Sequence, residues 1–207
     1  APAPRPRPGL RERVKARTRE ELIDAAFSLF AERGFDAVTV DDIAARADVS
    51  PRTFFRYFPV KEDVVLARME DHTARLVEGL AARPASEPPL VALREALRAP
   101  LEELQATPQL CGVLKMVKSH PGVQAHDLAR RTRTEVALAE ALAERMGMDA
   151  RSDPRPLLIA TTFMAGVGAT VSAWLDDGSP GDLDARVDAF TDLMRGGFEP
   201  RRRGRSR

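Results

Sequence analysis

The sequence is poor in the residues that build cross-links and metal sites. It has one cysteine, Cys111, and three histidines, His72, His120 and His126, among 207 residues. A single cysteine excludes an intramolecular disulfide and suits a reducing cytosol. The histidines follow no HxxH or HExxH spacing, and Cys111 is too isolated in the sequence to complete a zinc site with them. We therefore predict no metal site.

Motifs of catalysis and of secretion are also missing. The chain has no Gly-rich phosphate loop, no nucleophile elbow and no paired carboxylates beyond ordinary charges on helix surfaces. Its first residues are rich in Pro and Arg and lack the apolar segment of a secretory signal. These absences predict a cytoplasmic protein that is not an enzyme, with no catalytic residue and no cofactor.

Charge is nearly balanced over the whole chain but is distributed unevenly. The net charge is +1, yet residues 1–61 carry 12 basic and 9 acidic side chains, whereas residues 62–198 carry 15 and 21. Residues 199–207 carry five basic side chains and one acidic side chain, and we interpret them as a disordered basic tail. Because nucleic acid attracts positive charge, the N-terminal part can bind it by charge and the acidic middle cannot.

The start of the chain, APAPRPRP, alternates with proline. This composition predicts a disordered or polyproline II arm over residues 1–17 that runs into the first helix. Two interpretations remain open. Arg5 and Arg7 either reach DNA phosphates or the minor groove, or the arm is a solvated leader without a role.

The segment TVDDIAARADVSPRTFFRYF, which begins at Thr39, predicts two short helices joined by a three-residue turn. Thr39 and Asp42 form a capping box, and an apolar stripe at helical spacing follows. Ser50 is a second N-cap, with Pro51 at the first helical position, where a missing N–H costs nothing. Pro59 ends the second helix.

A third helix, Arg19–Glu32, supplies the apolar surface that two such short helices need for a core. Thr18 with Glu21 forms a capping box at its start, although the helix-prone sequence RERVKAR also permits a start near Leu10. Together the three helices predict a small DNA-binding unit whose last helix is presented outward.

This pattern resembles the helix-turn-helix region of the tetracycline-repressor-like (TetR) family of transcriptional regulators. The matching positions are Ala26, Leu29, Phe30, Gly34, Thr39, Val40, Ile43, Ala44, Ala47, Val49, Ser50, Thr53, Phe55, Tyr57, Phe58 and Lys61. Three residues depart from the family pattern. Asp48 stands where the family usually has Gly, and Asp tolerates the left-handed conformation that a tight turn needs. Phe55 replaces a usual Tyr, and Val60 replaces a usual Ser or Thr.

The resemblance implies an all-α fold, with a helix-turn-helix DNA-binding domain over residues 18–61. A larger helical domain for ligand binding and dimerisation follows over residues 62–198. The sequence agrees, since it shows no alternating strand pattern and no internal repeat. With three helices before residue 61, the chain has about nine in total. The later ones are expected at 61–83, 90–106, 108–119, 122–146, 157–177 and 183–195.

The resemblance also implies which side chains contact DNA. Arg52 is the first choice for a base contact, because a guanidinium pairs with guanine O6 and N7, and a phosphate contact is the alternative. Tyr57 and Lys61 are expected to contact phosphate. Two copies related by a two-fold axis would read a palindromic operator in double-stranded DNA, with half-site centres roughly 34 Å apart. The full predicted set is Thr39, Ser50, Pro51, Arg52, Thr53, Phe55, Arg56, Tyr57 and Lys61.

The segment Leu157–Leu175 contains no charged residue across 19 positions, which is long enough for a membrane span. Thr, Ser and Gly residues dilute its hydrophobicity, and no second span accompanies it. A soluble helix buried on one side by its own domain and on the other by a second subunit gives the same pattern. We therefore predict that this segment is a helix of a soluble protein and that the chain has no membrane partner. The resemblance implies that the last two helices form a four-helix bundle in a homodimer.

Finally, the resemblance implies a small-molecule pocket in the larger domain. The predicted function is a sequence-specific DNA-binding transcriptional regulator, a repressor released from its operator by a small, largely apolar effector. The alternative is a helical dimerisation module without DNA regulation, and the choice between repressor and activator stays open. The candidate pocket residues, which a plain apolar core would also contain, are Met69, Leu110, Leu114, Met116, Val117, Phe163 and Val167.

Overall fold

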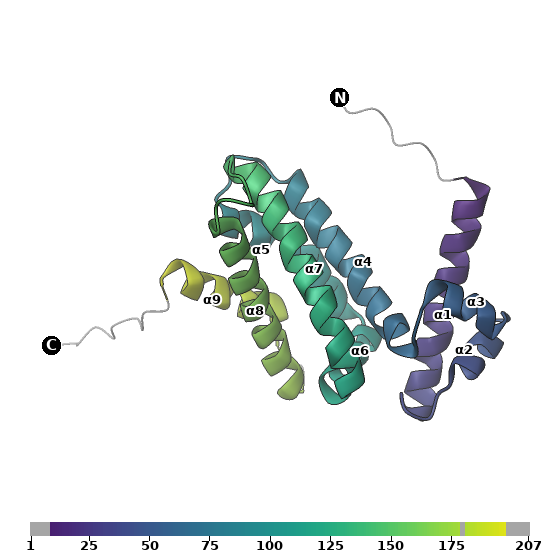
Figure 1. The fold of residues 1–207 in the computed structure, drawn as a ribbon. Coiled ribbons are helices and arrows are strands. Elements are labelled where there is room, and N and C mark those ends of the chain that lie inside the picture. Colours follow the sequence, from purple (N-terminus) through teal and green to yellow (C-terminus); the bar gives the residue numbers. More distant parts are fainter. Residues whose placement is uncertain (1–8, 179–180, 198–207) are drawn as a thin grey trace. The chain divides into compact units, whose positions relative to one another are not determined.

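The computed structural model describes residues 9–178 and 181–197, and within these ranges it contains nine α-helices and no strand (Figure 1). The predicted all-α fold is confirmed. Arg5, Arg7 and the predicted tail 199–207 lie outside the described residues. The helices are α1 Leu10–Arg33, α2 Val40–Arg46, α3 Pro51–Tyr57, α4 Lys61–Ala82, α5 Pro89–Ala106, α6 Pro108–Ser119, α7 Pro121–Met146, α8 Arg155–Asp176 and α9 Leu183–Arg195.

Proline and short polar side chains set most of the helix starts. Pro89, Pro108 and Pro121 occupy the first positions of α5, α6 and α7, where the backbone N–H needs no partner. At α9 the Asp182 carboxylate accepts a hydrogen bond of 2.9 Å from the Asp184 N–H. The helix limits after residue 61 therefore fall close to the predicted ones.

Helix α1 starts at Leu10, which confirms the earlier of the two starts that the sequence permits. Its N-cap is Gly9, whose N–H donates to the Glu12 carboxylate at 3.0 Å. The predicted capping box of Thr18 and Glu21 is wrong, because the helix-prone sequence RERVKAR carries the helix through this point. Residues 10–17, which we predicted to belong to a disordered arm, are helical.

The helices fall into two compact units. The first comprises the described residues up to Glu70 together with Met116–Asp127. The second comprises Asp71–Lys115 and the described residues from Leu128 onward. The division lies later in the chain than residue 61, and the corner between α6 and α7 belongs to the first unit.

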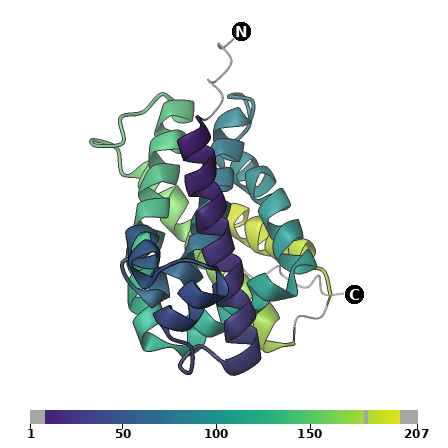
Figure 2. The same ribbon diagram turned by 90° about the vertical axis from the view of Figure 1, so that its right-hand side faces the viewer.

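In the first unit α1 packs against α2, and α2 packs in turn against α3 (Figure 2). Its core contains large apolar side chains from all three helices, and each is at most 1% exposed: Leu22, Ile23 and Leu29 of α1, Ile43 of α2 and Phe54 of α3. Burial of such large apolar side chains is the main term that holds three short elements together.

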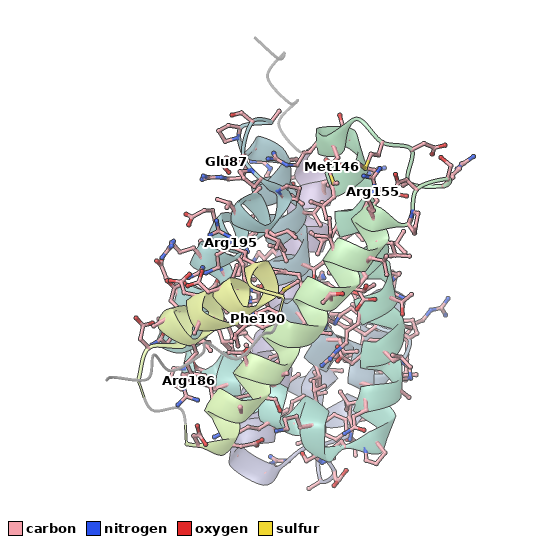
Figure 3. The ribbon with its side chains drawn as sticks, turned by 90° about the vertical axis from the view of Figure 1, so that its left-hand side faces the viewer. Glu87, Met146, Arg155, Arg186, Phe190 and Arg195 are labelled. Atoms are coloured by element: carbon pink, nitrogen blue, oxygen red, sulfur yellow. The ribbon has the colours of Figure 1, made fainter. Side chains whose placement is uncertain are left out.

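The second unit draws its core from five helices. Leu80 of α4, Leu93 of α5, Leu142 of α7, Phe163 of α8 and Leu183 of α9 are all fully buried. Helix α9 crosses α8 at a large angle (Figure 3). The core thus joins segments from both ends of the larger domain.

The crossing of α8 and α9 depends on a glycine. A Cβ atom at Gly166 of α8 would lie 1.9 Å from Cζ of Phe190 in α9, so a larger residue would displace the ring. The Phe190 ring also lies 6.2 Å from the ring of Phe163, centroid to centroid. Gly166 therefore allows the close approach of the two helices.

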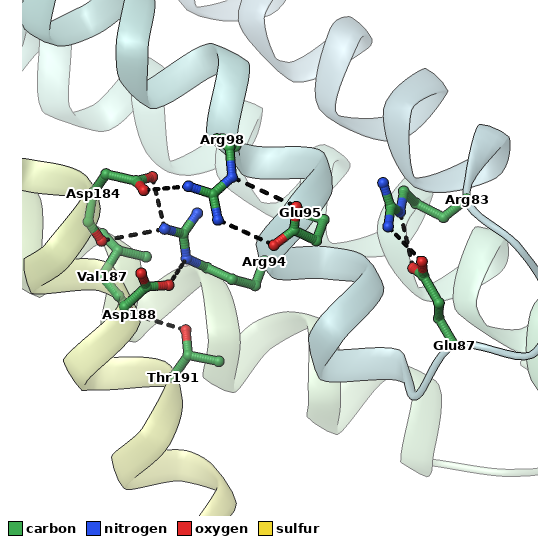
Figure 4. A network of polar contacts seen from close by, with 9 residues as sticks. All are labelled: Arg83, Glu87, Arg94, Glu95, Arg98, Asp184, Val187, Asp188 and Thr191. Carbon is green, nitrogen blue, oxygen red and sulfur yellow. Dashed lines mark hydrogen bonds and ion pairs between the residues drawn. The ribbon is translucent and has the colours of Figure 1, made fainter.

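Arginine side chains fasten α9 to α5 (Figure 4). Arg94 of α5 is 4% exposed and forms ion pairs of 2.6 Å with Asp184 and 2.5 Å with Asp188, both on α9. Arg98, one turn further along α5, pairs with Asp184 at 2.6 Å and with Glu95 at 3.1 Å. A buried guanidinium requires such partners, so the network fixes where α9 packs.

A second arginine, Arg145 of α7, binds the connection between α4 and α5. Its guanidinium donates to the carbonyl oxygens of Leu80 at 3.4 Å and Arg83 at 2.7 Å. It also donates to those of Pro84 at 2.8 Å and Glu87 at 3.4 Å. Leu80 lies in the last turn of α4, and the other three carbonyls lie in the connection that follows it. Such carbonyls lack the full set of helical donors, so Arg145 acts as a cap for the end of α4.

We expect Arg145→Ala to lower the free energy of unfolding by about 2–3 kcal/mol, because several carbonyls lose a charged donor at once. Arg145→Lys should recover only part of this loss, since one ammonium cannot replace a planar fork. Urea unfolding followed by circular dichroism measures the change. The control is exposed Arg151→Ala, which should shift stability by at most about 0.5 kcal/mol. Equal stability of the Arg145→Ala and control variants would contradict the capping role.

Candidate nucleic-acid interface

The turn between α2 and α3 is held by backbone hydrogen bonds and one left-handed residue. The Ala47 N–H donates to the Ile43 carbonyl at 3.0 Å, and the Val49 N–H donates to the Ala44 carbonyl at 2.9 Å. Asp48 has φ of +54°. The expectation that Asp takes the left-handed conformation at this position is confirmed, and the turn keeps its tight geometry.

Helix α3 has a buried side and an exposed side. Phe54 is fully buried, whereas the next residue, Phe55, is 53% exposed. The two rings meet edge to face, with their centroids 5.7 Å apart. Arg52 and Arg56 are exposed with Phe55, while Tyr57 is half-buried beneath the Arg56 guanidinium, 5.2 Å from the ring centroid. The exposed side of α3 thus combines two guanidinium groups with one aromatic ring.

The predicted capping residues are engaged in capping. The Thr39 hydroxyl accepts from the Asp42 N–H at 3.1 Å and donates to the Asp42 carboxylate at 2.6 Å. The Thr39 N–H also donates to this carboxylate at 2.9 Å, and the two donated bonds lower the pKa of Asp42 below its ordinary value. The Ser50 hydroxyl accepts from the Thr53 N–H at 3.2 Å and lies 3.0 Å from the Thr53 hydroxyl. Thr39 and Ser50 therefore position α2 and α3 with their side chains.

Lys61 lies elsewhere than predicted. Its ammonium donates to the carbonyl oxygens of Phe35 at 2.8 Å and Val38 at 2.9 Å, and it lies 4.1 Å from the centroid of the Phe35 ring. The ammonium thus makes two hydrogen bonds and one cation–π contact with the loop between α1 and α2. We therefore replace the predicted phosphate contact of Lys61 with a structural role, anchoring the start of α4 to this loop.

Most other arginines around α2 and α3 are paired with acids. Arg46 pairs with Glu32 at 2.9 Å, and Arg68 pairs with Asp24 at 2.5 Å. Across the residues that the structure describes, Arg52 forms no ion pair, and neither does Arg56. The exposed side of α3 therefore carries positive charge that no described acidic side chain neutralises.

The seven predicted pocket residues divide between the two units. Leu110, Leu114, Phe163 and Val167 belong to the second unit, and Met69, Met116 and Val117 belong to the first. Phe163 and Val167 lie in the core of the second unit, and Leu114 packs against that core. Their common role stays a prediction.

An open groove on the surface of α8 and α9 shares none of those seven residues. Its lining is small or polar except for Phe190, and we call it the α8–α9 groove: Thr161, Thr162, Ala165, Gly166, Ala169, Thr170 and Phe190. An uncharged exposed stripe along α8 includes three of these groove residues, Thr162, Ala165 and Ala169. It continues to Leu158 at one end and to Ala173 at the other. The opposite side of α8, with Phe163 and Trp174, is buried. This helix is long and apolar enough to cross a membrane, but one such helix is weak support for a span.

We predicted from the sequence that the chain has no metal site. No group of three or more His, Cys, Asp or Glu side chains that could hold a metal occurs in the described ranges 9–178 and 181–197. Burial raises the pKa of the Cys111 thiol, which disfavours the reactive thiolate.

Comparison with known proteins adds the following. Residues 22–67 match the family described as bacterial regulatory proteins, tetR family, and residues 87–199 match the MftR C-terminal domain family. The HTH-type transcriptional regulator TcmR of Streptomyces glaucescens is 38% identical over 195 residues, covering 90% of this chain and 85% of TcmR. The HTH-type transcriptional activator FasR of Mycolicibacterium smegmatis is 26% identical, covering 87% of this chain and 82% of FasR. The fatty acid degradation regulator FadR of Bacillus halodurans has the same fold, with a TM-score of 0.62 at 22% identity, over 89% of this chain and 97% of FadR.

If Lys61 anchors the loop between α1 and α2, Lys61→Met should lower the free energy of unfolding by about 1–3 kcal/mol, because two half-buried carbonyls lose their donor. Chemical denaturation monitored by far-UV circular dichroism would detect this. Unchanged stability together with weaker binding to all DNA sequences would instead support the phosphate contact predicted for Lys61.

Proposed function

This chain belongs to the TetR family of bacterial regulatory proteins, and on that premise we propose that α3 enters the DNA major groove with its exposed side. The chain is a DNA-binding transcriptional regulator. The observation that carries our proposal is the free positive charge of Arg52 and Arg56 on a helix whose opposite side is buried through Phe54. A helix that is fixed on one side and basic on the other suits a groove lined by phosphates.

We assign the roles on α3 by geometry and chemistry. Arg52, in the first turn, is placed to bind guanine O6 and N7, and Arg56, one turn later, to bind phosphate. Tyr57 directs its hydroxyl to a phosphate, Thr53 contacts a thymine methyl or a phosphate, and exposed Phe55 contributes its ring edge. Thr39, Ser50 and Pro51 act through the caps and helix start that hold these side chains in place.

The regulator acts as a dimer, since one short recognition helix reads too few base pairs for selection in a genome. We propose that the uncharged stripe of α8, together with the α8–α9 groove, forms the contact between subunits. Small side chains permit close packing of helices, and the stripe has no charged group that would need to be desolvated. With this contact the protein is soluble and cytoplasmic and does not insert into a membrane, because the second subunit covers the apolar face of α8.

We propose repression as the mode of action, because occupation of a promoter is sufficient for it. A small, largely apolar effector would release DNA by binding more tightly to the dimer form that does not fit the operator. We propose no catalytic role and no cofactor for this chain. A dimerisation module without DNA regulation is the alternative, and gel shifts with the DNA that flanks its own gene separate the two.

Arg52→Ala should relax base preference at one position of each half-site, at a cost of about 1–3 kcal/mol for the preferred sequence. The matched control is Arg56→Ala, which should weaken binding by a similar factor on all sequences. Fluorescence anisotropy against operator DNA and single-base variants separates the two effects. Two variants with the same effect on every sequence would contradict the base contact of Arg52.

Ala165→Glu should convert the dimer to a monomer and abolish operator binding, because it places a carboxylate in the middle of an apolar contact between subunits. Ala81→Glu, at an exposed position of α4, is the control for the added charge. Analytical ultracentrifugation gives the oligomeric state. A dimer that survives Ala165→Glu would move the contact away from the exposed stripe of α8.

A further inference from the structure

The first two turns of α1, Leu10–Arg17, lie outside the packed part of the first unit. Every residue in this segment is exposed, and the buried positions of α1 begin only at Leu22. At 1.5 Å per residue the segment is roughly 12 Å long. Figures 1 and 2 both show it extending along the helix axis beyond α2 and α3. These two turns therefore contribute no buried side chain to the core of the unit.

The segment carries positive charge that is not neutralised. Its basic residues are Arg11, Arg13, Lys15 and Arg17, against Glu12 alone. Glu12 caps the helix by accepting from Gly9, and Arg17 pairs with Glu21 at 2.8 Å. Within the described part of the chain, Arg11, Arg13 and Lys15 have no ion pair. Together with Arg52 and Arg56 of α3, they are the exposed, unpaired cations among the described residues of this unit.

The position of these cations around the helix separates them into two sets. Residues at intervals of three and four share one side of a helix, so Arg11 and Lys15 continue the side of α1 that buries Leu22, Ala26 and Leu29. This is the side on which the rest of the unit packs. Arg13 and Arg17 lie on the opposite, outer side. Arg11 and Lys15 therefore lie beyond the core of this unit, on the side of α1 that faces its other helices.

We propose that Arg11 and Lys15 bind DNA phosphates that flank each half-site, so that α1 extends the contact made by α3. This proposal rests on the proposed function. The helix that carries the cations packs against α2, which packs against α3, so their distance from the reading helix is fixed. The contact carries no sequence information and adds affinity that depends strongly on salt.

A lipid surface is the less favoured partner for the same charge. A helix that lies in a membrane interface needs a broad apolar face. This segment offers only Leu10 and Val14, one turn apart. Phosphate groups along a DNA backbone require no apolar face, and they match two cations spaced one helical turn apart on one side.

The test compares two double variants of the full chain that remove equal charge from the two sides of α1. These are Arg11→Gln with Lys15→Gln, and, as the control, Arg13→Gln with Arg17→Gln. Gln has a helix propensity close to that of Arg and Lys, and circular dichroism verifies that α1 persists. Fluorescence anisotropy gives the dissociation constant for operator and for unrelated DNA over a range of salt concentrations.

For the Arg11 and Lys15 variant we expect the slope of the logarithm of the association constant against log salt to become less negative. The change should be about 3.6 for a dimer, or about 0.9 for each of four lost contacts. Affinity at low salt should fall by the same factor on both DNAs, and the control should keep the wild-type slope. Equal effects in both variants, or none in either, would overturn the proposal. A result with lipid would also overturn it. In that result the wild-type protein binds vesicles of phosphatidylserine and phosphatidylcholine, only the Arg11 and Lys15 variant loses this binding, and the slope on DNA is unchanged. Wild-type protein without DNA binding would overturn the proposed function as well, whereas an unchanged slope in a protein that binds its operator overturns this inference alone.

Discussion

Burial of Phe54 is the constraint on which the DNA-binding surface depends. Helix α3 has only seven residues, and a helix of that length has little stability of its own. Its orientation comes from Phe54, which is fully buried in the core of the first unit. Once that side chain is fixed, the period of the helix turns Arg52, Phe55 and Arg56 outward. The exposed side of α3 thus follows from a packing requirement on its other side.

The polar contacts of the first unit refine this arrangement. The Thr39 and Ser50 caps set where α2 and α3 begin, and Asp48 accepts the left-handed conformation between them. Lys61 then ties the start of α4 to the loop that precedes α2. In the second unit the ion pairs of Arg94 and the contact of Phe190 with Gly166 fix α9 upon α5 and α8. A dimer needs that rigidity, because the spacing of two reading helices depends on the geometry of the subunit contact.

Much of this fold could be predicted from the sequence, because proline, glycine and capping side chains act on the nearest residues. Ser50 with Pro51 marked the start of α3, and the alternation of Phe54 and Phe55 between core and surface follows from helical period. The target of the Lys61 ammonium could not be predicted, because it lies on a loop more than 20 residues earlier in the chain. For α1 the sequence left two starts open, because Thr18 and Glu21 satisfy a capping pattern inside a helix that in fact continues through them from Leu10. The approach of Phe190 to Gly166 likewise depends on two helices that only the tertiary structure brings together.

The central claim is that two copies of this chain read the major groove of DNA through the exposed side of α3. Methylation interference tests it most directly, because methylation of guanine N7 adds a methyl group in the major groove at the atom assigned to Arg52. The account predicts that such methylation prevents binding at two groups of guanines whose centres lie about one helical turn, or 34 Å, apart. Binding that tolerates N7 methylation at every guanine of the bound DNA would contradict it.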